Sequence, residues 1–124
     1  MKLLKPIISE SVYKILHSLV RKRKTIEAKP LNDELVKAEI VKDNFLHSKT
    51  VSLNSIVEFI ISSFKKPMRF QIVLPEDADL TKKKISILSP IATALFGFKE
   101  ADHFIWKMPS GEKNIKILKV YNAQ

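Results

Sequence analysis

The sequence contains no cysteine, which excludes disulfide bonds and thiolate metal sites. Its two glycines are too few for a glycine-rich phosphate-binding loop. No apolar run approaches the roughly 20 residues of a membrane-spanning helix. The start of the chain has charges and a proline (Lys2, Lys5 and Pro6) where a signal peptide has an apolar core. We therefore expect a cytoplasmic protein without a membrane partner.

Acidic residues are also in the minority, because 22 lysines and arginines face 13 aspartates and glutamates, giving a net charge of +9 over 124 residues. This charge favours a polyanionic partner or an acidic protein surface, and it cannot choose between them. The excess is divided almost evenly: ten basic and six acidic residues in 1–45, and twelve and seven in 46–124. A dedicated nucleic-acid arm would concentrate the charge, so the even division argues against one.

Two amphipathic helices are predicted in the N-terminal third. The first has Ser9 or Ser11 as its candidate N-cap. Its apolar stripe at helical spacing comprises Val12, Ile15, Leu16, Leu19 and Val20. The second helix is predicted over residues 31–41, beyond a connection that ends at Pro30. Because the connection is short and each helix has one apolar face, the pattern predicts an antiparallel hairpin.

After Asn44 the pattern changes to that of β-structure. Alternation predicts strands over residues 51–61, 68–74 and 85–88. Pro90 suits the first position of a short helix that Gly97 ends, and its apolar face comprises Ile91, Ala94, Leu95 and Phe98. Residues 104–108 and 115–121 predict a closing hairpin around a turn at 109–112.

The predicted fold class is α+β. We expect a short antiparallel helical hairpin in residues 1–45, followed by an antiparallel β-sheet packed on one short helix in residues 46–124. An apolar face on so short a hairpin needs a cover, so we expect the hairpin to dock on the sheet domain.

One segment carries more specific information. Residues 85–97, Ile-Ser-Ile-Leu-Ser-Pro-Ile-Ala-Thr-Ala-Leu-Phe-Gly, resemble the signature of the C-terminal domain of the GreA/GreB elongation factors, where a strand runs into Ser-Pro and a short helix. Asp102, Trp106, Pro109 and Gly111 continue the match. Residues 31–35 and 51–55 resemble the regulator of nucleoside diphosphate kinase (Rnk) subfamily, in which the helical hairpin is truncated. The resemblance covers roughly residues 31–121.

The resemblance implies an FKBP-like sheet domain that docks on the rim of the secondary channel of bacterial RNA polymerase. The implied contact centres on the strand-to-helix junction at Leu88, Ser89, Pro90 and Ile91. Phe96 is most simply a core or helix-packing residue, and if exposed it would join this contact. A helix that starts at proline presents a rigid edge, so docking costs little conformational entropy. We expect a monomer with no enzymatic activity, no cofactor, no metal and no catalytic residue.

Two positions depart from the family pattern. Leu88 stands where some Gre proteins have a polar or acidic residue, which removes a charge-assisted contact there. Ala101 stands where related chains often have glycine, and this difference concerns the turn.

The Gre factors insert a long hairpin whose acidic tip helps to hold a catalytic metal ion, and this chain lacks both properties. Its first predicted helix, of about 13 residues, reaches roughly 20 Å. Within the tip, residues 22–29, Glu27 is the single acid. Asp33 and Glu34 are interpreted as helix-cap and dipole partners. We therefore expect polymerase binding without stimulation of transcript cleavage, in competition with Gre-type factors or modulating them.

Two basic runs are candidate nucleic-acid contacts: Arg21, Lys22, Arg23 and Lys24, and residues 82–84. Neither has the interleaved aromatic residues that stack on bases, so a solvated surface is the simpler interpretation. His17, His47 and His103 lie in separate segments without metal-ligand spacing. Two alternatives stay open: a direct nucleic-acid binder, and an FKBP-like prolyl isomerase that rests on fold analogy alone.

Overall fold

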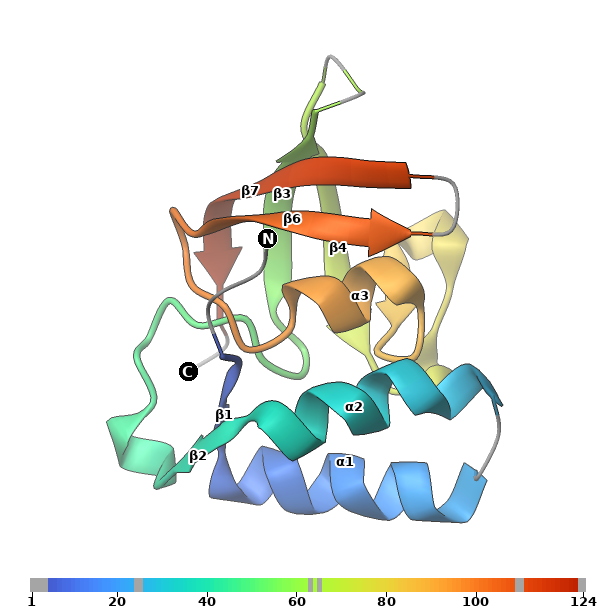
Figure 1. The fold of residues 1–124 in the computed structure, drawn as a ribbon, viewed down its shortest axis with the longest axis vertical. Coiled ribbons are helices and arrows are strands. Elements are labelled where there is room, and N and C mark those ends of the chain that lie inside the picture. Colours follow the sequence, from blue (N-terminus) through green and yellow to red (C-terminus); the bar gives the residue numbers. More distant parts are fainter. Residues whose placement is uncertain (1–4, 24–25, 63, 65, 109–110, 123–124) are drawn as a thin grey trace.

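The structure is a computed structural model that describes residues 5–23, 26–62, 64, 66–108 and 111–122. Figure 1 shows a five-stranded sheet at the top and a pair of helices, α1 (Glu10–Arg23) and α2 (Lys29–Lys37), at the bottom. The short helix α3 (Pro90–Leu95) lies between them. The predicted α+β class and the predicted pair of helices are confirmed.

The strands and the short 3-10 helices complete the chain. The strands are β1 (Ile7–Ser9), β2 (Glu39–Val41), β3 (Ile56–Ile61), β4 (Met68–Val73), β5 (Lys84–Ser86), β6 (His103–Met108) and β7 (Gly111–Tyr121). The 3-10 helices are η1 (Ile26–Ala28), η2 (Asp43–Phe45), η3 (Pro75–Asp77) and η4 (Leu80–Lys82). A turn is also expected from the sequence near residues 65–67; this turn and the predicted turn at 109–112 lie partly outside the described residues, which omit Lys65 and residues 109–110.

Helix α1 forms where the apolar spacing predicts it. The Ser9 hydroxyl accepts a hydrogen bond from the Val12 N–H at 3.4 Å, as an N-cap does. Leu16 is fully buried, whereas Ile15, which belongs to the predicted stripe, is 45% exposed. The stripe that reaches the core is therefore narrower than the sequence pattern indicates.

Helix α2 is shorter at its C-terminal end than predicted. It ends at Lys37, where Ala38 turns to an extended conformation (ψ 147°), and the next residues form β2. Strand β2 pairs in parallel with β1, and Ile8 lies opposite Ile40. The prediction of helix as far as Val41 was wrong. Strand β1, with which these residues pair, lies about 30 residues earlier in the chain, and the helical spacing of apolar residues contains no information on so distant a contact.

The main sheet has the order β5-β4-β3-β7-β6. Every neighbouring pair is antiparallel except β4 and β5, which are parallel. The prediction of an all-antiparallel sheet was wrong for this pair, because the chain between them crosses over through η3 and η4 and enters β5 in the direction of β4. The third predicted strand also begins one residue earlier, at Lys84.

The predicted strand over residues 51–61 forms only from Ile56 onward. Asn54 has a positive φ of 72°, and the Ser52 N–H donates to the Ser55 hydroxyl at 2.8 Å. Local side-chain hydrogen bonds of this kind compete with strand pairing, so residues 52–55 form a turn. Val51 is nevertheless buried, which explains why its position fitted the alternating pattern.

A single hydrophobic cluster joins the hairpin to the sheet. It includes Leu16, Leu31 and Leu35 of the hairpin, Leu95 of α3 and Phe59 of β3, all at most 3% exposed. The expected docking of the hairpin on the sheet domain is therefore confirmed. The division of the chain into domains at residue 45 stays a prediction.

Candidate functional site

The strand-to-helix junction is held rigidly by its own hydrogen bonds. The Ser86 hydroxyl accepts from the Leu88 N–H at 3.0 Å, and the Ser86 carbonyl accepts from the Ser89 N–H at 2.9 Å. The buried Thr93 hydroxyl donates to the Ile87 carbonyl at 2.8 Å. Few conformations are open to the backbone here, so the exposed residues that follow are already ordered.

Three of the five predicted contact residues reach the surface. Pro90 is exposed, and Ser89 and Ile91 are partly exposed. Leu88 is 3% exposed and Phe96 is 1% exposed, so both side chains belong to the core. The idea that Phe96 is part of an exposed patch was wrong, because the chain leaves α3 toward the sheet at this residue. We call Ser89, Pro90 and Ile91 the docking edge.

The Ser89 hydroxyl has an unusual environment. Ser89 occupies the N-cap position of α3, yet its side chain makes no capping hydrogen bond. Within the described part of the chain, its Oγ is buried and has no hydrogen-bond partner. An unpaired buried hydroxyl costs on the order of 1–3 kcal/mol. Because the Oγ is buried, it adds no contact surface to the docking edge.

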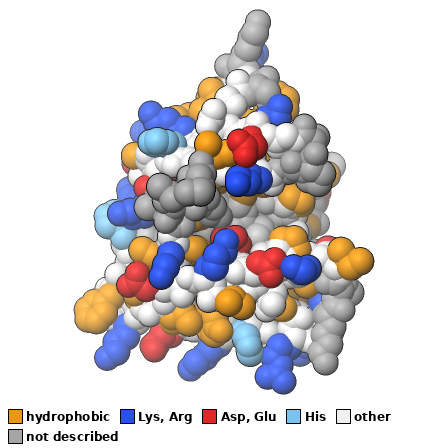
Figure 2. All heavy atoms as spheres, in the orientation of Figure 1, with side chains coloured by type: hydrophobic (Ala, Val, Ile, Leu, Met, Phe, Trp, Pro, Cys, Tyr) orange, Lys and Arg blue, Asp and Glu red, His pale blue; other side chains and the backbone are white. Residues whose placement is uncertain are grey.

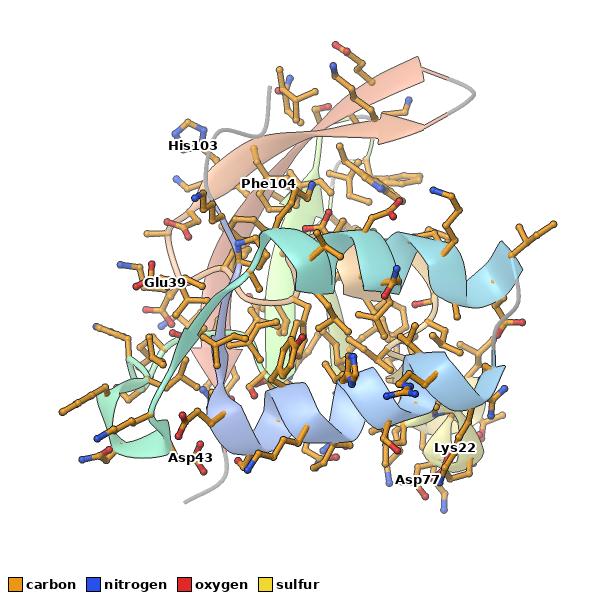
Figure 3. The ribbon with its side chains drawn as sticks, turned by 60° about the horizontal axis from the view of Figure 1, so that its bottom comes forward. Lys22, Glu39, Asp43, Asp77, His103 and Phe104 are labelled. Atoms are coloured by element: carbon orange, nitrogen blue, oxygen red, sulfur yellow. The ribbon has the colours of Figure 1, made fainter. Side chains whose placement is uncertain are left out.

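The basic residues predicted as nucleic-acid contacts lie at the C-terminal end of α1. Arg21, Lys22 and Arg23 are exposed in the last turn, where cations are stabilised by the helix dipole. Figure 3 places Lys22 at this end and Asp43 near the other. Lys24 lies outside the described residues. On the face that Figure 2 shows, basic and acidic side chains are interspersed over the two helices, so the charge forms no continuous basic patch on that face.

The two acids proposed as helix caps have a different role. Helix α2 begins at Lys29, so Asp33 and Glu34 lie beyond its first turn and cannot cap it. Asp33 pairs with Lys29 at 3.1 Å, and Glu34 pairs with Lys37 at 3.0 Å. The cap interpretation was wrong because the helix starts earlier than predicted, with Pro30 inside its first turn.

Hydrogen bonding lowers the pKa of two aspartates. The pKa of Asp43 is lowered first by a hydrogen bond to the Ser11 side chain and then by the Ser11 backbone N–H, which lies 3.1 Å from its Oδ1. The pKa of Asp79 is lowered chiefly by a hydrogen bond from the Thr81 hydroxyl, at 2.6 Å. Asp43 ties η2 to the start of α1, whereas Asp79 fixes its own local backbone, and neither lies in the docking edge.

Gly97 and Asn122 make tertiary contacts that the sequence does not indicate. Gly97 has φ +87°, and a Cβ there would lie 2.4 Å from the Pro6 Cβ. Asn122 donates from Nδ2 to the Ser48 and Thr50 carbonyls at 2.8 Å each, and its Oδ1 accepts from the Ser55 hydroxyl. The positive φ of Gly97 is compatible with its predicted role as a helix terminator, but its contact with Pro6 has no signal in the sequence.

The described residues contain no group of three or more histidine, aspartate and glutamate side chains that could hold a metal ion. His103 is exposed on β6, while the neighbouring Phe104 points into the core (Figure 3). In the described part of the chain, no helix has the length and apolar character required to cross a bilayer.

Comparison with known proteins gives the family. The domain family described as "Transcription elongation factor, GreA/GreB, C-term" matches residues 46–122. Transcription elongation factor GreA from Acidiphilium cryptum is 31% identical over 106 residues, which are 84% of this chain and 68% of that protein. GreA from Rhodopseudomonas palustris is 38% identical over 90 residues, 73% of this chain and 57% of that protein. The chain thus spans between about half and two thirds of these relatives.

A solved structure matches over almost the whole chain. The prokaryotic transcription elongation factor GreA/GreB from Nitrosomonas europaea superposes with a TM-score of 0.75 and 30% sequence identity. The match covers 96% of this chain and 99% of that chain, so it includes the hairpin as well as the sheet domain. From the family match, the relatives and this superposition together, the chain belongs to the GreA/GreB family of transcription elongation factors.

Proposed function

We propose that this protein binds bacterial RNA polymerase at the rim of the secondary channel through its docking edge and does not stimulate transcript cleavage. It would then compete with longer-armed Gre-type factors or modulate them. The observation that carries the proposal is the rigid, surface-exposed junction at Ser89, Pro90 and Ile91. The polymerase partner itself is inferred from the family.

The chemistry of the docking edge supports a protein partner. Pro90 and Ile91 offer apolar surface that loses little entropy on binding, because their backbone is already fixed. The Ser89 Oγ is buried, so the partner would contact the exposed atoms of the edge rather than this hydroxyl.

The hairpin supports binding without cleavage. Helix α1 has 14 residues, which correspond to about 21 Å. Near its tip, Glu27 is exposed, and the next acids along the chain, Asp33 and Glu34, are engaged with lysines of α2. A catalytic metal needs several carboxylate oxygens. The described residues of the hairpin tip do not include such a group.

Retention on immobilised core RNA polymerase tests the docking edge. Wild type should be retained at low salt, and Pro90→Ala combined with Ile91→Asp should reduce retention at least about tenfold. Phe45→Asp is the matched control, since Phe45 is 71% exposed on η2 and lies outside the docking edge. Equal retention of wild type and the double variant would contradict the assignment. Absence of any retention of wild type would contradict polymerase binding itself.

Transcript cleavage in backtracked complexes tests the second half of the proposal. Addition of this protein alone should leave the cleavage rate at the intrinsic level of the polymerase. In the presence of a cleavage-active GreA, an excess of this protein should lower the rate, and the docking-edge variant should not. Robust stimulation of cleavage by wild type would show that the short hairpin does deliver catalytic carboxylates.

Three further expectations belong to this proposal. We expect the protein to be cytoplasmic, to belong to the Rnk subfamily and to be a monomer. Direct nucleic-acid binding by Arg21, Lys22 and Arg23 is the second candidate, because these exposed cations lie together in one helical turn. It predicts an affinity for oligonucleotides without polymerase that falls steeply as salt rises.

A peptide isomerisation assay tests the prolyl isomerase alternative, and we expect no activity in it.

A further inference from the structure

A hollow beside β4 has the composition of a binding site and does not include the docking edge. Its volume is about 540 Å³, within the range of sites that hold a ligand or a short peptide segment. Three cations line it, Arg69, Lys82 and Lys83, and no carboxylate is among the lining residues. The hollow is therefore electropositive.

The rest of the lining is mainly apolar, and two of the three cations lie near aromatic rings. Ile56, Pro67, Met68 and Phe70 supply the apolar surface. The Lys83 Nζ is 5.8 Å from the centroid of the partly exposed Phe70 ring. The Arg69 guanidinium is 4.9 Å from the centroid of Tyr121. Cation–π contacts orient these charges without neutralising them, so they remain available to an anionic ligand.

The backbone of β4 has an open edge at the hollow. The Gln71 N–H donates to the Lys83 carbonyl at 2.9 Å, whereas the Ile72 N–H donates to Ser55 on the other side. Because strand residues alternate, the N–H and C=O of Arg69 face the same side as those of Gln71. Strand β5 pairs only with Gln71–Val73, so no described strand covers Arg69 on that side.

We propose that this hollow binds an extended acidic peptide segment of a partner protein. The segment adds to the open edge at Arg69, places carboxylates beside Lys82 and Lys83, and lays an apolar side chain near Phe70. Glu58, opposite Arg69 on β3, offsets part of the Arg69 charge, so the two lysines carry most of the attraction. Asp79, the acid nearest them in the chain, is hydrogen-bonded to Thr81.

A peptide fits these features better than a nucleic acid does. Base stacking requires an open aromatic face, and here the ammonium of Lys83 lies over Phe70 and the guanidinium of Arg69 over Tyr121. The open N–H and C=O of Arg69 match a second polypeptide backbone, which a sugar–phosphate chain does not reproduce. The proposal does not depend on the docking edge.

Fluorescence anisotropy with a labelled ten-residue peptide of alternating glutamate and valine tests the proposal. Wild type should bind it saturably at low salt. Lys82→Glu combined with Lys83→Glu should weaken binding at least about tenfold. The matched control, Lys42→Glu with Lys49→Glu, makes the same change in net charge at exposed residues outside the hollow and should leave the affinity within about twofold of wild type. Circular dichroism confirms that both variants are folded.

The contribution of the strand edge is tested separately. Arg69→Ala removes the guanidinium, and Arg69→Pro also removes the N–H at a position where an edge strand tolerates proline. Arg69→Pro should bind the peptide at least about threefold more weakly than Arg69→Ala. Three results would each overturn the proposal: no saturable binding by wild type, equal loss in the two charge-reversal variants, or tighter binding of a ten-nucleotide single-stranded DNA than of the peptide.

Discussion

At the scale of single residues, Gly97 determines how closely the N-terminal segment approaches the sheet domain. The Ile7 N–H donates to the Gly97 carbonyl at 2.9 Å, and the Gly97 N–H donates to the Val51 carbonyl at 3.0 Å. A side chain at this position would clash with Pro6 as well as strain the backbone. Three segments that are distant in the sequence therefore meet at one residue without a side chain.

Gly97→Ala and Gly111→Ala separate these two effects. Both glycines have positive φ, but a Cβ at Gly111 meets no atom within 4 Å. Gly97→Ala should therefore lower the free energy of unfolding by about 1–3 kcal/mol more than Gly111→Ala does. Urea denaturation followed by circular dichroism measures the difference. Equal losses would show that the contact with Pro6 is relieved without cost.

Asp43 gives a residue-scale prediction on pH. Its pKa is lowered in the folded protein by hydrogen bonds to Ser11, so the carboxylate stabilises the fold above the unfolded pKa of about 3.9. This contribution disappears as the pH falls through the lowered folded pKa. Asp43→Asn should therefore show a weaker loss of stability than wild type between about pH 5 and pH 2. Urea titrations across that range check this; identical slopes would contradict it.

At the scale of elements, the short parallel pair of β1 and β2 anchors the base of the hairpin. Its two central residues lie opposite one another, but Ile8 is 2% exposed and Ile40 is 44% exposed. Ile8 faces the common core and Ile40 faces solvent. The stabilising part of this element is therefore one face of β1, although both strands contribute backbone hydrogen bonds.

Alanine substitution at the two paired isoleucines tests this asymmetry. Ile8→Ala should lower the free energy of unfolding by about 2–4 kcal/mol, because it leaves a cavity in the core. Ile40→Ala should cost less than about 1 kcal/mol. Hydrogen exchange of α1 amides gives a second measurement, and Ile8→Ala should raise their exchange more than Ile40→Ala does. The opposite order would place the anchor on β2.

At the scale of the whole molecule, the continuous hydrophobic cluster predicts one cooperative unfolding transition. Trp106 lies in β6 and reports on the sheet, while circular dichroism at 222 nm reports mainly on the helices. Because Leu31, Leu35 and Leu95 share one cluster, both signals should change at the same urea concentration. A separate, earlier loss of the helical signal would show that the hairpin is an independent unit.

Local sequence patterns determined most elements of this protein. Helical spacing and a serine cap located α1, the proline start located α3, and alternating apolar residues located β4 and the closing strands. These features depend on neighbours within one or two turns, so the sequence contains their full signal. The Ser-Pro motif likewise gave the family, which the comparisons confirm.

Tertiary structure decided what those patterns could not. The pairing of β1 with β2, the parallel position of β5, and the contact of Gly97 with Pro6 each join segments that are distant in the chain or depend on the path of a crossover. Only packing showed that Leu88 and Phe96 are core residues, leaving Ser89, Pro90 and Ile91 as the exposed edge. Local periodicity reports that a side chain is apolar, whereas its burial depends on which distant element covers it.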